Sequence, residues 1–130
     1  IKDKRVIFKG ALPHKEAKEL QSKATILVNP RGNNEEFTKY SFPSKIMEYM
    51  LTGRPVLCFK LDGMPDEYDD YLNYFESTES MAEDIEKYCQ MPEEELTKIG
   101  KKAQQYVLEN KNVHIQTKRM LEMIDNCKNS

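Results

Sequence analysis

The chain has 130 residues, of which 38% are hydrophobic and 32% are charged. These proportions are typical of a globular chain and exclude a disordered one, so residues 1–130 are expected to form a single domain. No apolar run approaches the roughly 20 residues of a membrane span. The net charge of −2 argues against nucleic acid as a partner.

The first third of the chain predicts a strand, a helix, a second strand and a long loop. Residues 5–9 form a short β-type run that ends at Gly10. Residues 13–24 have the apolar spacing of an amphipathic helix, and the continuous apolar run 25–28 is typical of a strand in a parallel sheet. Residues 30–40 are polar, and loops of this length are usually functional or mobile.

The central stretch, residues 41–57, predicts a loop, a short helix, a helix stop and a buried strand. Pro43 suits the first turn of a helix, whereas Gly53 can close a helix and Pro55 prevents its continuation. Glu48 is the one acid in an otherwise apolar helical run. It follows Ser44 by four residues, so both lie on one face of the helix.

The rest of the chain continues the alternation of strands and helices. Residues 55–59 and 72–75 are the next strand candidates, and helices are expected from Ser77 or Ser80 to about 90, over 93–109 and over about 112–126. This order predicts an α/β fold, a Rossmann-like parallel sheet with helices on both faces and right-handed crossovers. Ligands bind such sheets at the carboxyl ends of the strands.

The run SFPSKIMEYMLTGRPVL at 41–57 resembles the signature of the carboxyl-terminal, nucleotide-sugar-binding domain of GT-B glycosyltransferases, especially glycosyltransferase family 4. The similarity includes VIFKGALP and ILVNP upstream and GMPDEY downstream, so it covers most of the chain. In that family a glutamate-bearing helix follows a Gly-Phe-Pro-like loop. A second glutamate usually precedes it by eight positions, where this chain has Tyr40.

The resemblance implies a role for each residue of a donor site. Glu48 would bind the ribose hydroxyls of a UDP- or GDP-sugar, and Tyr40 would line the sugar side of the pocket. The remaining donor-site residues would lie around the diphosphate, the sugar or the nucleobase: Phe42, Pro43, Ser44 and Lys45 at the helix start, Gly10, Ala11 and Leu12 after the first strand, and Arg31, Asn33 and Asn34 in the long loop.

Each of these features also has a structural alternative. Glu48 could form an ion pair with Lys45, three residues before it, and Ser44 could be an ordinary helix cap. The turn at Gly10 could simply connect a strand to a helix. The three cysteines have no metal-type spacing, and the chain has no Walker loop or glycine-rich dinucleotide motif, so no cofactor and no metal are expected.

The resemblance further implies a retaining glycosyltransferase that moves a sugar from a nucleotide diphosphate sugar to an acceptor hydroxyl, with bacterial polysaccharide synthesis as one setting. A complete enzyme would also have an acceptor domain and two earlier βα units, and residues 5–9 would lie at the far edge of its sheet. It would be cytoplasmic, with peripheral binding at the inner membrane as one arrangement. Two alternatives stay open, a nucleotide-sugar 2-epimerase of the same fold and a non-catalytic flavodoxin-like interaction module.

Overall fold

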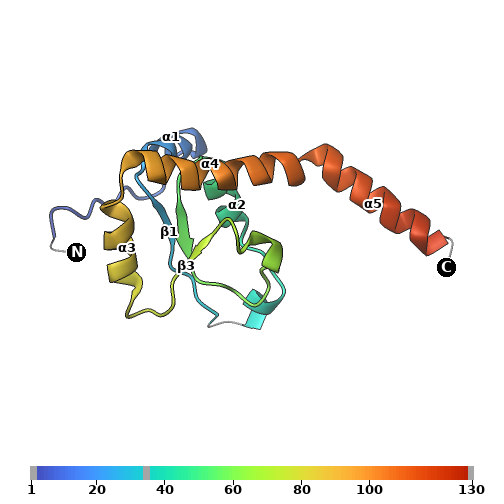
Figure 1. The fold of residues 1–130 in the computed structure, drawn as a ribbon, viewed down its shortest axis with the longest axis horizontal. Coiled ribbons are helices and arrows are strands. Elements are labelled where there is room, and N and C mark those ends of the chain that lie inside the picture. The colour runs from blue at the N-terminus through green and yellow to red at the C-terminus, as the bar shows by residue number, and fades with distance from the viewer. Residues whose placement is uncertain (1–2, 34–35, 129–130) are drawn as a thin grey trace.

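Three short parallel strands form the centre of the computed structural model, which describes residues 3–33 and 36–128 (Figure 1). They are β1 (Leu27–Asn29), β2 (Val56–Cys58) and β3 (Asn73–Tyr74), in the order β1-β2-β3. Val28 pairs with Leu57 between β1 and β2, and Cys58 pairs with Tyr74 between β2 and β3. All three carboxyl ends therefore lie at one edge of the sheet, as the sequence predicted.

Helices connect and follow the strands. Their bounds are α1 (His14–Lys23), η1 (Glu36–Lys39), α2 (Ser44–Met50), η2 (Asp66–Tyr68), α3 (Met81–Cys89), α4 (Glu93–Asn110) and α5 (Val113–Lys128), where η1 and η2 are short 3-10 helices. The expected helices over 13–24, 93–109 and 112–126 are thus confirmed within three residues at each end. The α/β fold with an open parallel sheet is confirmed as well.

The core lies mainly on one face of the sheet, beneath α2 and α4. Val56 and Cys58 of β2 are buried there with Ile46 and Met50 of α2 and with residues of α4. Leu57, between them in the strand, points to the opposite face, because successive strand side chains alternate. There it lines a small cavity together with residues of α3. Burial also raises the pKa of the Cys58 thiol to about 12, which keeps it protonated and unreactive.

Two glycines allow α2 and α4 to cross at close range. Gly53 has a φ of +73°, and its N–H closes α2 by donating to the Met50 carbonyl, 3.2 Å away. Gly100 of α4 lies directly against this turn. A Cβ atom at Gly100 would be only 2.0 Å from the Gly53 carbonyl oxygen. The helix pair is further linked by the Gln104 amide, which donates to the Leu51 carbonyl at 2.7 Å.

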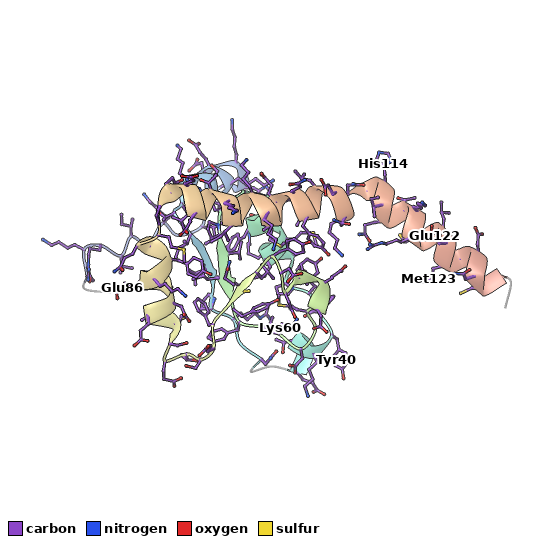
Figure 2. All side chains as sticks on the ribbon, viewed as in Figure 1. Tyr40, Lys60, Glu86, His114, Glu122 and Met123 are labelled. Carbon is purple, nitrogen blue, oxygen red and sulfur yellow. The ribbon has the colours of Figure 1, made fainter. Side chains whose placement is uncertain are left out.

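Helix α5 extends away from the sheet and the other helices (Figure 1). His114, Glu122 and Met123 project from it into solvent (Figure 2). Several of its large apolar side chains are exposed as well, among them Met120, Leu121 and Ile124. None of the helices described in residues 3–33 and 36–128 is long and apolar enough to cross a bilayer.

The prediction of a strand over residues 5–9 is wrong. This segment is in no strand, and its apolar side chains are open to solvent, with Phe8 87% exposed. An isolated extended segment gains no ladder hydrogen bonds, and here it does not pair with the outer edge of β1. The strand propensity of this stretch is therefore not realised in the described sheet.

Gly100→Ala is expected to destabilise the fold by about 1–3 kcal/mol, the usual range for overpacking. The added methyl group collides with the Gly53 backbone, and this outweighs the roughly 1 kcal/mol by which alanine favours a helix over glycine. Urea denaturation measures the free energy of unfolding. Lys98→Ala, at an exposed position of the same helix, is the control and should change it little; an equally stable Gly100→Ala variant would contradict the proposed close contact.

Candidate functional site

The loops that follow β1 and β2 meet at the carboxyl edge of the sheet. The loop after β1 leads through η1 to α2, and the loop after β2 leads through η2 to β3. These two loops lie against each other. The N–H of Gly63 donates to the carbonyl of Thr38 at 3.0 Å, and a Cβ at Gly63 would come within 2.7 Å of that oxygen. A side chain here would push the loops apart, so Gly63 fixes their spacing.

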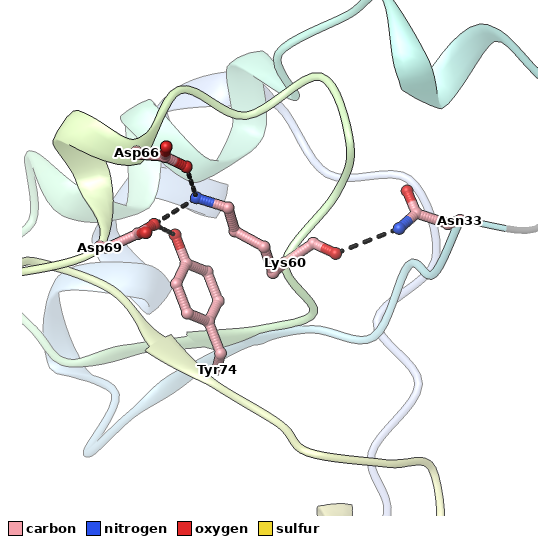
Figure 3. A network of polar contacts seen from close by, with 5 residues as sticks. All are labelled: Asn33, Lys60, Asp66, Asp69 and Tyr74. Carbon is pink, nitrogen blue, oxygen red and sulfur yellow. Dashed lines mark hydrogen bonds and ion pairs between the residues drawn. The ribbon is translucent and has the colours of Figure 1, made fainter.

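A polar network around Lys60 holds the second loop over this edge (Figure 3). Lys60 directly follows the apolar run of β2. Its ammonium binds Asp66 at 3.0 Å and also binds Asp69, which accepts a hydrogen bond from the Tyr74 hydroxyl at 2.9 Å. Since both carboxylates already neutralise this ammonium, Lys60 stabilises the loop and is not a free cation for a phosphate group.

The network shifts the pKa values of its members. Burial disfavours the charged form of Lys60, but hydrogen bonds with Asp69 and Asp66 outweigh this and raise its pKa. The pKa of Asp69 is lowered, chiefly because Lys60 donates to it. Burial and the neighbouring Asp69 raise the pKa of Tyr74, which stays a neutral donor. Lys60 and Asp69 are therefore charged, and Tyr74 is neutral, throughout the neutral pH range.

Asn33 joins the loop after β1 to the loop after β2. Its amide nitrogen donates to the Lys60 carbonyl at 3.2 Å and to the Asp62 carboxylate at 3.1 Å. Its amide oxygen accepts from the Asp62 N–H at 3.1 Å. These three bonds use most of the capacity of the side chain, so Asn33 acts here as a link between loops.

Glu48 lies in the second turn of α2 and faces α1. One carboxylate oxygen accepts a hydrogen bond from the Gln21 amide at 3.0 Å, and the other forms an ion pair with Lys45 at 3.2 Å. The Gln21 bond lowers the pKa of Glu48; burial opposes this shift, and Lys45 reinforces it. Glu48 is therefore ionised at neutral pH, and its side chain remains 23% exposed. The ion pair considered as the alternative role of Glu48 is present.

A second region lies on the other side of α2, around Tyr40. It is an open cavity of about 470 Å³, lined by aromatic residues of both loops and by the junction of α4 and α5. Tyr40 is 84% exposed, and Figure 2 shows it projecting outwards from the loop before α2. Phe42 packs on Tyr68 with a ring-centroid separation of 4.6 Å. Tyr40 and Phe42 thus share one cavity, and Glu48 is not among its lining residues.

The other predicted residues are distributed around these two regions. Ser44 and Lys45 are exposed at the start of α2, immediately after Pro43. Arg31 is exposed in the loop after β1, where its N–H donates to the Asn29 side chain at 3.2 Å. Gly10, Ala11 and Leu12 lie in the extended segment before α1 and follow no strand, and Asn34 lies outside the described residues.

Sequence reasoning missed four side chains that shape these regions. The sequence does point to Lys60, because this cation directly follows the apolar run 55–59 that was expected to form a strand. Gln21 lies seven residues after His14, on one face of α1, but nothing in its spacing predicted a bond to α2. Glu67 and Lys111 are 44 residues apart and meet only through the fold. Within residues 3–33 and 36–128, no group of three or more potential ligands could hold a metal ion.

Comparison with known proteins assigns the fold to a family. The model of the family described as "Glycosyl transferases group 1" matches residues 1–91. No curated protein and no solved structure matches significantly. The matched region contains every strand of the sheet, the whole of α2 and both edge loops, and its parallel α/β arrangement agrees with a partial Rossmann-like GT-B domain. The chain therefore belongs to the group 1 glycosyl transferases and is a GT-B glycosyltransferase domain.

Proposed function

We propose that this domain binds the nucleotide diphosphate sugar of a retaining glycosyltransferase that transfers the sugar to an acceptor hydroxyl. In this proposal the ribose lies at Glu48, the diphosphate lies along the start of α2, and the sugar lies towards Tyr40. An acceptor domain and earlier βα units would complete the enzyme. We infer cytoplasmic synthesis of a bacterial polysaccharide as its setting, from the same resemblance.

The observation that carries this proposal is the position of Glu48. It is an ionised carboxylate on a helix whose neighbouring side chains, Ile46 and Met50, are buried in the core. A carboxylate offers about four lone-pair positions, and Gln21 and Lys45 occupy two of them. The remaining positions can accept two hydroxyl hydrogens, as a vicinal diol requires.

The chemistry needs stabilisation of the leaving diphosphate, which gains negative charge as the glycosidic bond to it breaks. Fixed N–H groups and cationic side chains provide such stabilisation without reorganisation during the reaction. Lys45 is one cation that this domain presents beside Glu48; unlike Lys60, it pairs with a single carboxylate in the described contacts, and its side chain is 51% exposed. Further cations would come from the proposed earlier βα units.

Gln21 orients the Glu48 carboxylate. The amide nitrogen of Gln21 reaches from α1 to α2 to make this bond, and its amide oxygen is buried with no hydrogen-bond partner among the residues that the structure describes. An unpaired buried acceptor has an energetic cost. The reverse orientation of the amide would place its oxygen against the carboxylate and repel it. The charge of Glu48 thus selects the observed orientation, and Gln21 in turn fixes the position of the carboxylate.

Gln21→Leu is expected to raise the pKa of Glu48, because it removes a hydrogen bond that favours the charged form. A carboxylate with a lowered pKa stabilises the fold above its unfolded-state pKa, and this contribution disappears as the pH falls through the folded-state pKa. The variant should therefore lose less stability between neutral and acid pH. Side-chain carboxyl ¹³C NMR measures the pKa directly. Gln90→Leu removes a similar bond, from Gln90 to Glu86, and is the control that should leave the pKa of Glu48 unchanged. If Gln21→Leu also left the pKa of Glu48 unchanged, the bond from Gln21 would be unimportant.

Glu48→Gln in the complete enzyme is expected to weaken donor binding by about tenfold to hundredfold. The change keeps the shape of the side chain but replaces charge-assisted hydrogen bonds of about 1.5–3 kcal/mol with weaker ones. Titration with nucleoside diphosphates measures the affinity, and thermal melting measures stability. If Glu48 served only the Lys45 ion pair, stability would change slightly and donor affinity would remain as in the wild type. That second outcome would remove the ribose assignment.

The 130-residue chain alone is expected to bind donor nucleotides weakly and to transfer no sugar. It would lack the cations of the proposed earlier units, and each lost charge-assisted hydrogen bond costs roughly 1.5–3 kcal/mol. NMR titration of the ¹⁵N-labelled chain detects binding in the millimolar range, with the amides of Ser44 and Glu48 shifting first. Tight binding or turnover by this chain would contradict the proposed division of the site.

A further inference from the structure

We propose that helix α5 pairs with α5 of a second copy of this chain, with the two helices running in opposite directions. The proposal goes beyond the proposed function and does not depend on the donor site. Its basis is an apolar stripe along α5, the way in which the end of α4 holds α5 away from the sheet, and the order of the charges beside the stripe.

One side of α5 is apolar and open to solvent. A helix turns by about 100° per residue, so side chains at spacings of three, four and seven lie in one stripe. The stripe holds five large apolar residues that are all exposed: Val113, Met120, Leu121, Met123 and Ile124. Within the described residues, no other element lies along α5 (Figure 1). Because most helices in proteins owe their stability to the packing of an apolar face, this stripe indicates a partner.

The junction between α4 and α5 fixes the start of α5. Asn112 caps this helix, since its side-chain oxygen accepts the N–H of Ile115 at 3.0 Å. The Gln116 amide donates to the carbonyl of the last residue of α4 at 3.3 Å, and Lys111 forms its ion pair with Glu67. Beyond these contacts, residues 117–127 are all exposed. The junction thus presents the stripe to solvent and does not return it to the sheet.

The polar side of α5 argues against an anionic membrane surface as the partner. Helices that lie on membranes usually have a polar face rich in lysine and arginine. In residues 113–127, Lys118 and Arg119 are balanced by Glu122 and Asp125. A stripe bordered by charges of both signs suits another protein helix whose border is complementary.

The order of the charges selects an antiparallel second copy. Lys118, Leu121 and Asp125 follow one another at spacings of three and four, so the cation and the acid lie on the same flank of the stripe. If the centre of an antiparallel pair lies between residues 121 and 122, Lys118 of each copy lies opposite Asp125 of the other. The same register places Met120 of each copy against Met123 of the other. A parallel pair would instead bring each charge next to its own counterpart.

Arg119 lies on the other flank, where its charge acts on its own domain. The pKa of Glu67 is lowered first by the hydrogen bond from Lys111, against the effect of burial, and also by the positive charge of Arg119. Arg119 therefore faces the junction of α4 and α5. The flank that carries Lys118 and Asp125 is left to the second copy.

Sedimentation velocity of the 130-residue chain, from micromolar to submillimolar concentration, measures the proposed association. This range is appropriate because small interfaces are usually weak. Met120→Lys places a charge within the stripe of both copies and should raise the dissociation constant at least about a hundredfold. Glu122→Lys introduces the same side chain on the opposite side of α5 and is the matched control, which should associate like the wild type. Far-UV circular dichroism checks that both variants keep the helix.

Charge reversal tests the orientation. Lys118→Glu and Asp125→Lys each place like charges opposite one another in an antiparallel pair, and each should raise the dissociation constant by roughly tenfold. The double variant restores opposite charges and should recover most of the wild-type affinity. Glu122→Lys breaks the same ion pair within α5 as Lys118→Glu does, at 4.0 Å, and so controls for effects on the helix itself. In a parallel pair, both single variants and the double variant would associate like the wild type.

Cys127 allows an independent test of the register. It is exposed near the end of α5 and, in the antiparallel register, lies opposite Gln116 of the other copy. The two Cys127 residues would be roughly 16 Å apart along the helices, too far for a disulfide. In a Cys89→Ser background, Gln116→Cys should therefore form disulfide-linked dimers when an added oxidant removes the hydrogens of the two thiols, whereas the background chain should not. Mass spectrometry of the linked peptides identifies the pair.

The outcomes separate this proposal from the proposed function. A chain that stays monomeric throughout the range, as it would if α5 bound another domain of the complete enzyme, would overturn the proposal, and so would a Met120→Lys variant that associates like Glu122→Lys. Disulfides between two Cys127 residues, or charge variants that all associate like the wild type, would overturn the antiparallel arrangement. None of these results bears on donor binding at Glu48.

Discussion

The close approach of α4 to the turn after α2 is the constraint on which the rest of this structure depends. Gly100 allows the backbone of α4 to lie against Gly53, and the Arg54 guanidinium pairs with Glu93 at the start of α4 at 2.6 Å. These contacts set the position of α2 over β2. They also fix the position of α4, the helix that Lys111 follows. One packing contact therefore positions both Glu48 and the Glu67–Lys111 pair.

Helix α2 separates two regions with different electrostatics. On the side of Glu48, an ionised carboxylate has two partners that leave half of its acceptor capacity open. On the side of Tyr40, aromatic rings lie beside the ion pair of Glu67 and Lys111. The first region offers acceptors to a diol, whereas the second offers aromatic surface beside one ion pair. Since Met47 lines one region and Glu48 lines the other, the two regions lie about 100° apart around α2.

Much of the fold could be predicted because the relevant signals are local. Continuous apolar runs identified β1 and β2, and Pro43, Gly53 and Pro55 delimited α2. The prediction of a strand at residues 5–9 was wrong because a strand also needs a neighbouring strand to pair with, and local propensity does not provide one. The same limit applies to the site. Glu48 was found through the motif around it, whereas its bond to Gln21 spans 27 residues and depends on how α1 packs.

The cavity illustrates a further limit of sequence reasoning. Tyr40 could be placed near a sugar only through a resemblance, and the sequence showed no substitute for the charge that a tyrosine lacks. Glu67 stands among several acidic residues, and nothing in this local sequence indicates a cation as its partner. Its partner, Lys111, lies 44 residues further along the chain, just after α4. Only the fold brings this carboxylate, its cation and the aromatic rings together.

A crystal structure of the domain with a bound nucleoside diphosphate hexose tests the central claim most directly. The account predicts that the two ribose hydroxyls lie within hydrogen-bond distance of the Glu48 carboxylate, about 3 Å. It also predicts that the sugar lies on the side of Tyr40. A donor whose ribose points away from Glu48, or one that binds at another edge of the sheet, would contradict it.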